Sequence, residues 1–212
     1  SIVNKKFEFH TLLDSEKPDI VFGTESWLTS NHTNSEIFPQ KLGYTPFRHD
    51  RNTGKSGGGV FILVKKSIVV SEMKRLQTNC EIIWLKLEIF GSQPLYLASY
   101  YRPHEHDEIS IIELRRSLER VNKLKGKVWL TGDFNFPKLV WDNEGVPTVK
   151  PGCSLPKLYE DFLSLINDFS LEQMVTFPTR LNNTLDLFLT SNPTLIKSVK
   201  SVTGISDHEI AK

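Results

Sequence analysis

The sequence predicts a single α/β (α+β) domain in which β-sheets are covered by helices. The chain has 212 residues, which suits one large domain with its own core better than two small ones. Strand-like apolar runs outnumber the helical patterns and are interleaved with them. The sequence contains no internal repeat, low-complexity tract or Gly/Ser-rich linker that would divide it into separate units.

Three segments repeat apolar residues at the spacing of three and four that a helix requires, namely 9–13, 111–121 and 159–166. We expect the first helix to be short and to stop before Pro18. Ser154 is a plausible cap for the third helix.

The remaining apolar runs are short and are bounded by turn-forming residues, so we expect strands at 19–22, 59–64, 83–89, 95–101, 127–130, 171–176 and 185–190. In the run 83–89, Ile83 and Leu85 alternate with Trp84 and Lys86, which predicts a strand with two distinct faces.

Composition limits the classes of function. The net charge of +1 and the pI of about 7.8 are low for a dedicated nucleic-acid binder, so a DNA substrate would have to be met by a local basic patch or by bound metal. No apolar run approaches the roughly 20 residues of a membrane helix. The first residues do not form a secretory signal, and Cys80 and Cys153 are typical of a reduced intracellular protein.

Polar residues end several of the expected strands. Carboxylates and amides are oxygen ligands of the type that holds Mg²⁺. They stand at Glu25, Asp133, Asn135, Asp186 and, beside a histidine, at Asp207-His208. Taken singly, most of these residues could be a solvated carboxylate, a turn or a helix cap. Asp186 differs, because a carboxylate inside an apolar strand costs several kcal/mol unless it is paired or hydrogen-bonded.

Taken in order, these segments resemble the endonuclease/exonuclease/phosphatase superfamily, which includes the apurinic endonucleases. Its order is a metal-binding Glu, a Tyr at a strand end, Asp-x-Asn, an Asp that orients a histidine, and Ser-Asp-His. The matching residues here are Glu25, Tyr101, Asp133, Asn135, Asp186, Asp207 and His208. The resemblance implies a DNase I-like four-layer sandwich of two central, mostly antiparallel β-sheets flanked by helices.

Further segments look like the endonuclease domain of a LINE-type (non-LTR) retrotransposon, most closely its chicken-repeat branch. They lie at 24–28, 57–60, 101–103, 177–180 and 185–187. The resemblance implies one endonuclease domain over residues 1–212. It also implies two truncations, since the family's first strand, with its metal-site Asn, would lie upstream of Ser1, and the last strand is reduced to 209–212.

The resemblance implies a Mg²⁺-dependent enzyme, with Mn²⁺ as an alternative ion, that hydrolyses DNA and leaves a 3′-hydroxyl to prime reverse transcription. Glu25 would be the principal metal ligand, and Asp207 would lie beside the metal as a direct or indirect ligand. Asp133 would position or deprotonate the attacking water. Asn135 would hold that water or the phosphate.

Three further roles follow from the same resemblance. Asp186 would orient His208 and raise its pKa, and His208 would donate to a non-bridging phosphate oxygen. Tyr101 would hydrogen-bond the phosphate, with Tyr100 in its place if the strand register is shifted by one.

Basic residues near these segments could contact DNA phosphates. They are Arg48, Arg51, Lys55, Arg102 and Arg180. The glycines at 57–59 allow a close approach of backbone to DNA, or form only a bulged hairpin. The loop 177–184 could enter a groove of DNA and bias the choice of target.

The expected partner is double-stranded DNA, with no membrane and with a monomeric isolated domain. This domain would belong to a larger polyprotein with a reverse transcriptase, synthesised in the cytoplasm and acting in the nucleus. Two alternatives are open. One is a phosphatase or phosphodiesterase of the same fold acting on a small phosphate ester, although headgroup lysines and a membrane-facing apolar loop are not evident. The other is a non-catalytic DNA-binding remnant, although every catalytic residue that can be checked is intact.

Overall fold

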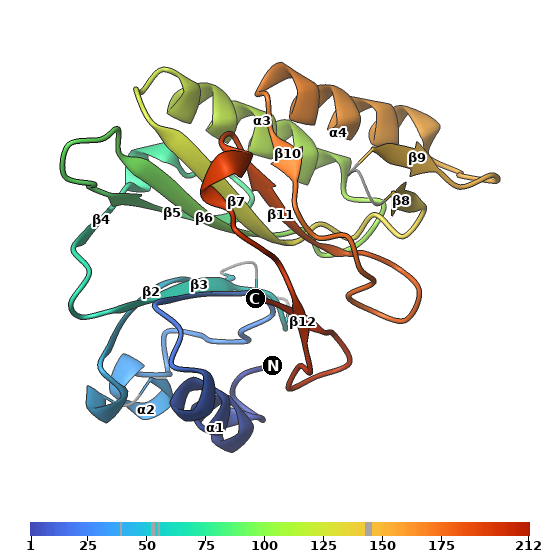
Figure 1. Ribbon diagram of the computed structural model, residues 1–212. Coiled ribbons are helices and arrows are strands. Elements are labelled where there is room, and N and C mark those ends of the chain that lie inside the picture. Colours follow the sequence, from blue (N-terminus) through green and yellow to red (C-terminus); the bar gives the residue numbers. More distant parts are fainter. Residues whose placement is uncertain (39, 52–53, 55, 143–145) are drawn as a thin grey trace.

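The computed structural model describes residues 1–38, 40–51, 54, 56–142 and 146–212. Its elements form four layers, with two β-sheets face to face in the middle (Figure 1). Helices α3 (Glu108–Asn122) and α4 (Pro156–Asp168) cover the larger sheet. Helices α1 (Lys6–Glu16) and α2 (Asn34–Ile37) cover the smaller one. The predicted four-layer α/β sandwich is therefore confirmed.

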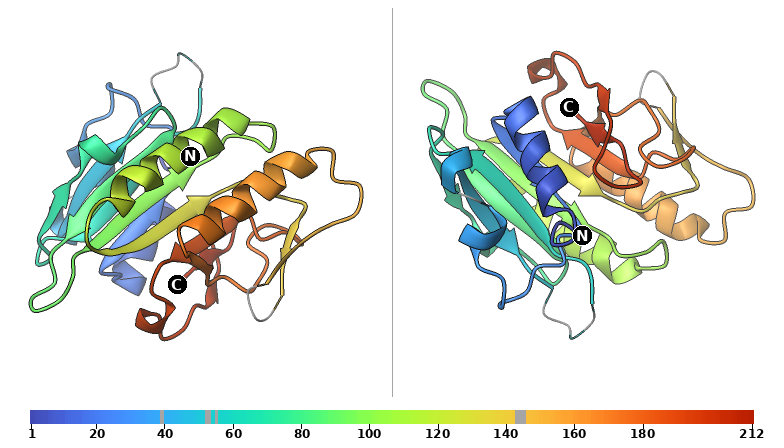
Figure 2. Two further views of the ribbon diagram at one scale, coloured as in Figure 1. Left: turned by 90° about the horizontal axis from the view of Figure 1, so that it is seen from above. Right: turned by 90° about the horizontal axis from the view of Figure 1, so that it is seen from below.

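The larger sheet has the strand order β10-β11-β7-β6-β5-β4. Its strands, in that order, are Glu172–Gln173, Asp186–Thr190, Lys127–Asp133, Leu95–Tyr101, Glu81–Leu87 and Val70–Glu72. Every neighbouring pair is antiparallel except β6 and β7, which run parallel. Seen from above, α3 and α4 lie side by side across this sheet (Figure 2).

The smaller sheet has the order β1-β3-β2, formed by Ile20–Gly23, Val60–Lys65 and Tyr44–His49. The central strand β3 alternates between the two sides of the sheet. Phe61 and Leu63 pack towards the helices, whereas Ile62 and Val64 pack between the sheets. Among the described residues, β1 pairs only with β3, so its other edge is open.

Two small hairpins complete the β-structure, one of β8 (Leu139–Trp141) with β9 (Pro147–Val149) and one of β12 (Ser201–Val202) with β13 (Ile210–Ala211). Short 3₁₀ turns lie at Gln40–Leu42, Lys74–Leu76 and Pro193–Leu195. No helix within the described part of the chain is long and apolar enough to cross a membrane.

Strand β5 shows how the larger sheet is packed. Trp84 faces the helices, where its indole Nε1 donates to the Ser117 hydroxyl at 2.8 Å. Ile83 and Leu85 face the smaller sheet. The expected two-faced strand is therefore buried on both sides, because helices cover one face of the sheet and a second sheet covers the other.

The expected helix cap at Ser154 is wrong. Helix α4 begins at Pro156 with Leu155 in the cap position, and no side chain makes the capping hydrogen bond. Proline fixes a helical φ, and the N–H that it lacks would have no partner within the first turn of the helix, which makes it a suitable first residue. Helix α3 has a side-chain cap, because Asp107 accepts the Ser110 N–H at 3.0 Å.

Candidate active site

Strand register places three predicted site residues in one row of the larger sheet. Tyr101 ends β6, Asp133 ends β7 and Asp186 begins β11. Asp133 is paired with Tyr101 in the parallel ladder and with Asp186 in the antiparallel ladder. Paired residues on neighbouring strands project from the same face, so the three side chains leave the sheet side by side.

His208 joins this row from the segment between β12 and β13. Its Nδ1 lies 2.7 Å from the Asp186 Oδ2, so this carboxylate fixes the ring orientation. Burial alone lowers the pKa of His208, but the hydrogen bond and charge of Asp186, together with Asp133, raise it above its ordinary value. Potential ligand atoms of Asp133, Asp186 and His208 all lie within 4.8 Å of one another.

Asp133 is 5% exposed, and the same loop holds both of its oxygens. The Asn135 backbone N–H donates to Oδ1 at 3.0 Å, and the Asn135 side-chain amide donates to Oδ2 at 3.3 Å. Burial, with the neighbouring charge of Asp186, raises the pKa of Asp133 to about 7. A carboxylate with such a pKa can take up and release a proton near neutral pH.

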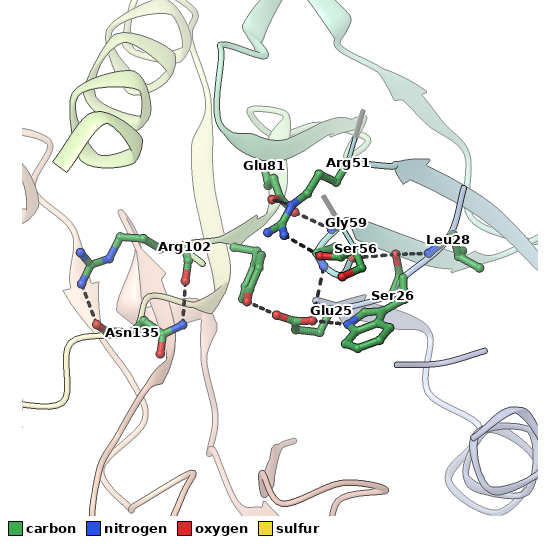
Figure 3. A network of polar contacts seen from close by, with 12 residues as sticks. Glu25, Ser26, Leu28, Arg51, Ser56, Gly59, Glu81, Arg102 and Asn135 are labelled. Atoms are coloured by element: carbon green, nitrogen blue, oxygen red, sulfur yellow. Dashed lines mark hydrogen bonds and ion pairs between the residues drawn. The ribbon is translucent and has the colours of Figure 1, made fainter. Parts of the chain in front are cut away.

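Glu25 lines the same cavity from the smaller sheet, but it is not among the described residues whose ligand atoms cluster with Asp133. It follows β1 with a φ of +52°, and both of its carboxylate oxygens accept hydrogen bonds (Figure 3). The Tyr101 hydroxyl donates to Oε1 and the Trp27 indole donates to Oε2. The Gly58 N–H donates to Oε2 at 3.4 Å. These contacts link the ends of the two sheets and fix the orientation of the Glu25 carboxylate.

The three glycines at 57–59 pack against the turn that carries Glu25. Gly58 and Gly59 have φ values of +73° and +85°. A Cβ at Gly58 would lie 2.3 Å from the Arg51 guanidinium carbon, and one at Gly59 would lie 2.5 Å from the Ser26 hydroxyl. The glycines therefore allow the chain to close on its own Glu25 turn.

These side chains line a shared cavity of about 610 Å³, which also extends along the open edge of β1. The predicted site residues in its wall are Glu25, Tyr101, Asp133, Asn135, Asp186, Arg180, Asp207 and His208. The carboxylates of Glu25, Asp133 and Asp186 are oxygen donors of the kind that Mg²⁺ and Mn²⁺ bind. The donor set therefore fits a divalent cation.

Asp207 stands apart from this cluster. Its carboxylate pairs with Arg180 at 2.7 Å, and its side chain is 66% exposed. Burial alone raises the pKa of Asp207, but a backbone hydrogen bond and the charge of Arg180 hold it below its ordinary value. Asp207 is not among the described residues whose ligand atoms cluster with Asp133. Metal binding by Asp207 stays a prediction.

The structure corrects the expectation for Arg102. Its side chain is fully buried, so it cannot contact a DNA phosphate. Its guanidinium donates to the backbone carbonyls of Phe134 at 2.6 Å, Asn135 at 2.7 Å and Glu105 at 3.0 Å. It also lies 3.7 Å from the centre of the Phe136 ring. Arg102 therefore holds the loop that carries Asn135 (Figure 3).

The other basic residues differ in the exposure of their side chains, and three of them form ion pairs. Arg48 pairs with Asp50 at 3.1 Å, and Arg51 pairs with Glu81 at 2.5 Å, and both arginine side chains are less than one-fifth exposed. Arg180 is 45% exposed and is engaged with Asp207. Phosphate contacts by these three arginines stay predictions. Lys55 lies outside the described residues.

The sequence alone leaves open whether Tyr101 or Tyr100 faces the site. The structure places Tyr101 in the cavity wall. Tyr100 is fully buried under α3, where its hydroxyl lies 2.6 Å from the Ser110 hydroxyl. The two tyrosines therefore face opposite sides of the sheet.

Comparison with known protein families gives a match to the endonuclease-reverse transcriptase family over residues 95–211, more than half of the chain. The chain belongs to this family. It thereby has the endonuclease/exonuclease/phosphatase fold that the motif order indicated. A comparison with curated protein sequences returned no match.

Solved structures agree on the fold of this endonuclease family member. The endonuclease domain of TRAS1, a telomere-specific non-LTR retrotransposon, is 14% identical with a TM-score of 0.70, over 99% of this chain and 89% of that chain. The AP endonuclease LMAP from Leishmania major is 12% identical with a TM-score of 0.71, over 97% and 82%. An AP endonuclease from Archaeoglobus fulgidus is 16% identical with a TM-score of 0.66, over 99% and 93%.

Sequence reasoning missed two residues that hold the site of this family member together. Glu81 binds Arg51 and accepts the Gly59 N–H, which fixes the glycine turn against Glu25 (Figure 3). Its pairing with Tyr101 across β5 and β6 is visible only once the register is known. Thr179 is fully buried and accepts the Asp186 N–H at 3.0 Å.

Proposed function

We propose that this chain is the endonuclease domain of a LINE-type retrotransposon that nicks target DNA and leaves a 3′-hydroxyl for reverse transcription. The observation that carries the proposal is the meeting of Asp133, the Asp186–His208 pair and the Tyr101-bound Glu25 in one cavity. Its membership of the endonuclease-reverse transcriptase family supports the same reaction and a downstream reverse transcriptase in one polyprotein.

The donor set suits Mg²⁺, with Mn²⁺ as an alternative. Glu25 would be the principal ligand of the cation, with Asp207 as a direct or indirect ligand, and the cation when bound supplies charge neutralisation at the phosphate and at the departing 3′ oxygen. The carboxylate of Asp186 is engaged with His208, so it is the weaker candidate as a ligand.

In the proposed reaction, a water oxygen attacks the phosphorus and the P–O3′ bond breaks. Asp133 accepts the proton of the attacking water, for which its raised pKa is suited. Asn135 keeps the Asp133 carboxylate in place through its backbone and side-chain N–H groups. The products are a 3′-hydroxyl and a 5′-phosphate.

His208 serves as the cationic donor in this scheme. Its Nδ1 is engaged by Asp186, which leaves Nε2 to donate to a non-bridging oxygen of the phosphate. The hydrogen bond and charge of Asp186 raise the pKa of His208, which shifts the ring towards the doubly protonated form, in which the donor carries a positive charge. A charged donor in a partly buried site stabilises the extra negative charge that develops on the phosphate.

The test is nicking of supercoiled plasmid DNA in the presence of Mg²⁺ or Mn²⁺. We expect conversion to the open-circular form, abolished by EDTA and by Asp133→Ala. Asp161→Asn, which alters an exposed acid of α4, is the matched control and leaves nicking unchanged.

A small phosphate ester assayed in parallel separates the alternative activity. Hydrolysis of the ester without plasmid nicking would overturn the endonuclease proposal in favour of a phosphatase. Sequence-independent DNA binding without hydrolysis of either substrate would identify a non-catalytic remnant. Size-exclusion chromatography and localisation of a tagged chain would test the proposed monomer and the proposed action in the nucleus.

A further inference from the structure

Thr179 is a fully buried residue that binds the backbone of Asp186 and the backbone of Glu209, the residue next to His208. Its hydroxyl oxygen accepts the N–H groups of Leu185 and Asp186, each at 3.0 Å. Its carbonyl oxygen accepts the N–H of Glu209, the residue after His208, at 2.7 Å. One side chain and one peptide group therefore connect the start of β11 with the segment that carries the histidine.

The residue after Thr179 holds the other flank of His208. Arg180 pairs with Asp207 at 2.7 Å. The histidine thus lies between two residues that are each bound by the consecutive pair Thr179-Arg180. This matters because β12 and β13, the strands on either side of the segment, have two residues each and give it little regular support.

We propose that Thr179 is a positioning residue that sets the distance between Asp186 and His208. The inference rests on the proposed nuclease function and adds a residue to its machinery. The hydroxyl fixes the backbone from which the Asp186 side chain projects, and the carbonyl fixes the backbone next to the imidazole. Loss of the hydroxyl lets β11 shift relative to the histidine segment.

Substitutions at Thr179 separate the effect of its hydroxyl acceptor from the effect of its side-chain volume. A hydroxyl oxygen has two acceptor lone pairs, which match the two N–H groups that it binds. Thr179→Val keeps the volume and removes the acceptor, whereas Thr179→Ser keeps the acceptor. Thr179→Cys offers a weak acceptor of similar size and serves if the valine variant is too unstable to assay.

Thr190 gives a matched control in the same strand. It is also fully buried, and its hydroxyl accepts the Asn192 N–H at 3.1 Å. Thr190 lies at the opposite end of β11 from Asp186, so Thr190→Val reports the general effect of losing a buried threonine hydroxyl from this strand.

The experiment measures kcat and KM for plasmid nicking. A misplacement of about 1 Å in a catalytic constellation costs on the order of 10²-fold in rate. We expect Thr179→Val to lower kcat by that factor with KM nearly unchanged, and Thr179→Ser and Thr190→Val to resemble the wild type. If Thr179 acts through the histidine, Thr179→Val will have no further effect in a His208→Ala background.

Several outcomes would overturn the inference. Wild-type kcat in Thr179→Val refutes it while the proposed function stands. An equal loss in Thr190→Val, or losses from Thr179→Val and His208→Ala that multiply in the double variant, would assign Thr179 a general structural role. A wild-type chain that does not nick DNA refutes the proposed function, and this inference falls with it.

Discussion

Replacing Arg102 with methionine tests whether a buried guanidinium holds the Asn135 loop. Methionine retains much of the aliphatic volume, but leaves the carbonyl oxygens of Phe134, Asn135 and Glu105 without their donor. Hydrogen bonds to a charged group contribute about 1.5–3 kcal/mol each. Removing a buried cation also relieves a desolvation cost of several kcal/mol. Burial lowers the pKa of Arg102, which agrees with such a cost.

The net result is a loss of about 3 kcal/mol in the free energy of unfolding. For a protein of this size each kcal/mol lowers Tm by about 2–4 °C, so we expect a fall of about 6–12 °C. Thermal unfolding measures it. Arg115→Met is the matched control, because Arg115 pairs with Asp168 in an ion pair whose side chains are 33% and 50% exposed, so its Tm should change little.

DNA binding measured at several salt concentrations distinguishes a role of Arg102 in holding the Asn135 loop from the phosphate contact that its place next to Tyr101 predicted. A lost phosphate contact reduces the slope of log K against log salt by about one. We expect Arg102→Met to leave that slope unchanged. An unaltered Tm together with a reduced slope would refute the structural role and restore Arg102 as a DNA ligand.

Two further predictions concern charge and hydrogen bonding in the cavity. The folded-state pKa of Asp133 is about 7 and its ordinary value is 3.8, so the folded state binds more protons between these values. Stability in EDTA should therefore fall as pH rises from about 4 to about 7, and Asp133→Asn should raise Tm at pH 8 but not at pH 4. Equal pH profiles for the two proteins would contradict this. Tyr101→Phe removes the hydroxyl that binds Glu25 and should lower kcat for nicking by about 10–100-fold, the equivalent of one hydrogen bond to a charged group. Tyr100→Phe, whose hydroxyl lies against Ser110 under α3, should lower Tm without this loss of rate, and a reversed pattern would show that the register assignment is wrong.

The strands that carry the site could be predicted because their sequences are locally clear. The runs that became β6 and β7 are apolar, bounded and followed by polar residues. Strand β2 was missed, since Pro46 and Arg48 interrupt its apolar character. It forms a strand because six of its residues pair with β3, a tertiary contact that local propensity does not contain.

The sequence predicts which residues form the site better than it predicts their hydrogen-bond partners. The order of the motifs predicted the residues around Asp133. The position of Arg102 next to Tyr101 predicted a phosphate contact, which was wrong because Arg102 is buried. The alternation of side chains along a strand could have indicated the environment of Arg102, because a residue next to one that faces the cavity projects to the opposite side. Glu81 binds the Gly59 N–H, 22 residues away in the sequence, and Thr179 binds the Asp186 N–H, 7 residues away. Neither spacing belongs to a helix or strand pattern, so the sequence alone does not mark these two residues.

We propose above that this chain cuts DNA to leave a primer for synthesis. The most direct measurement is polymerase extension of plasmid treated with the chain and Mg²⁺, using a labelled nucleotide and no prior treatment of the ends. We expect immediate extension from the nick, and none after treatment with Asp133→Ala. An absence of nicks, or nicks that are extended only after a 3′-phosphate has been removed, would contradict it.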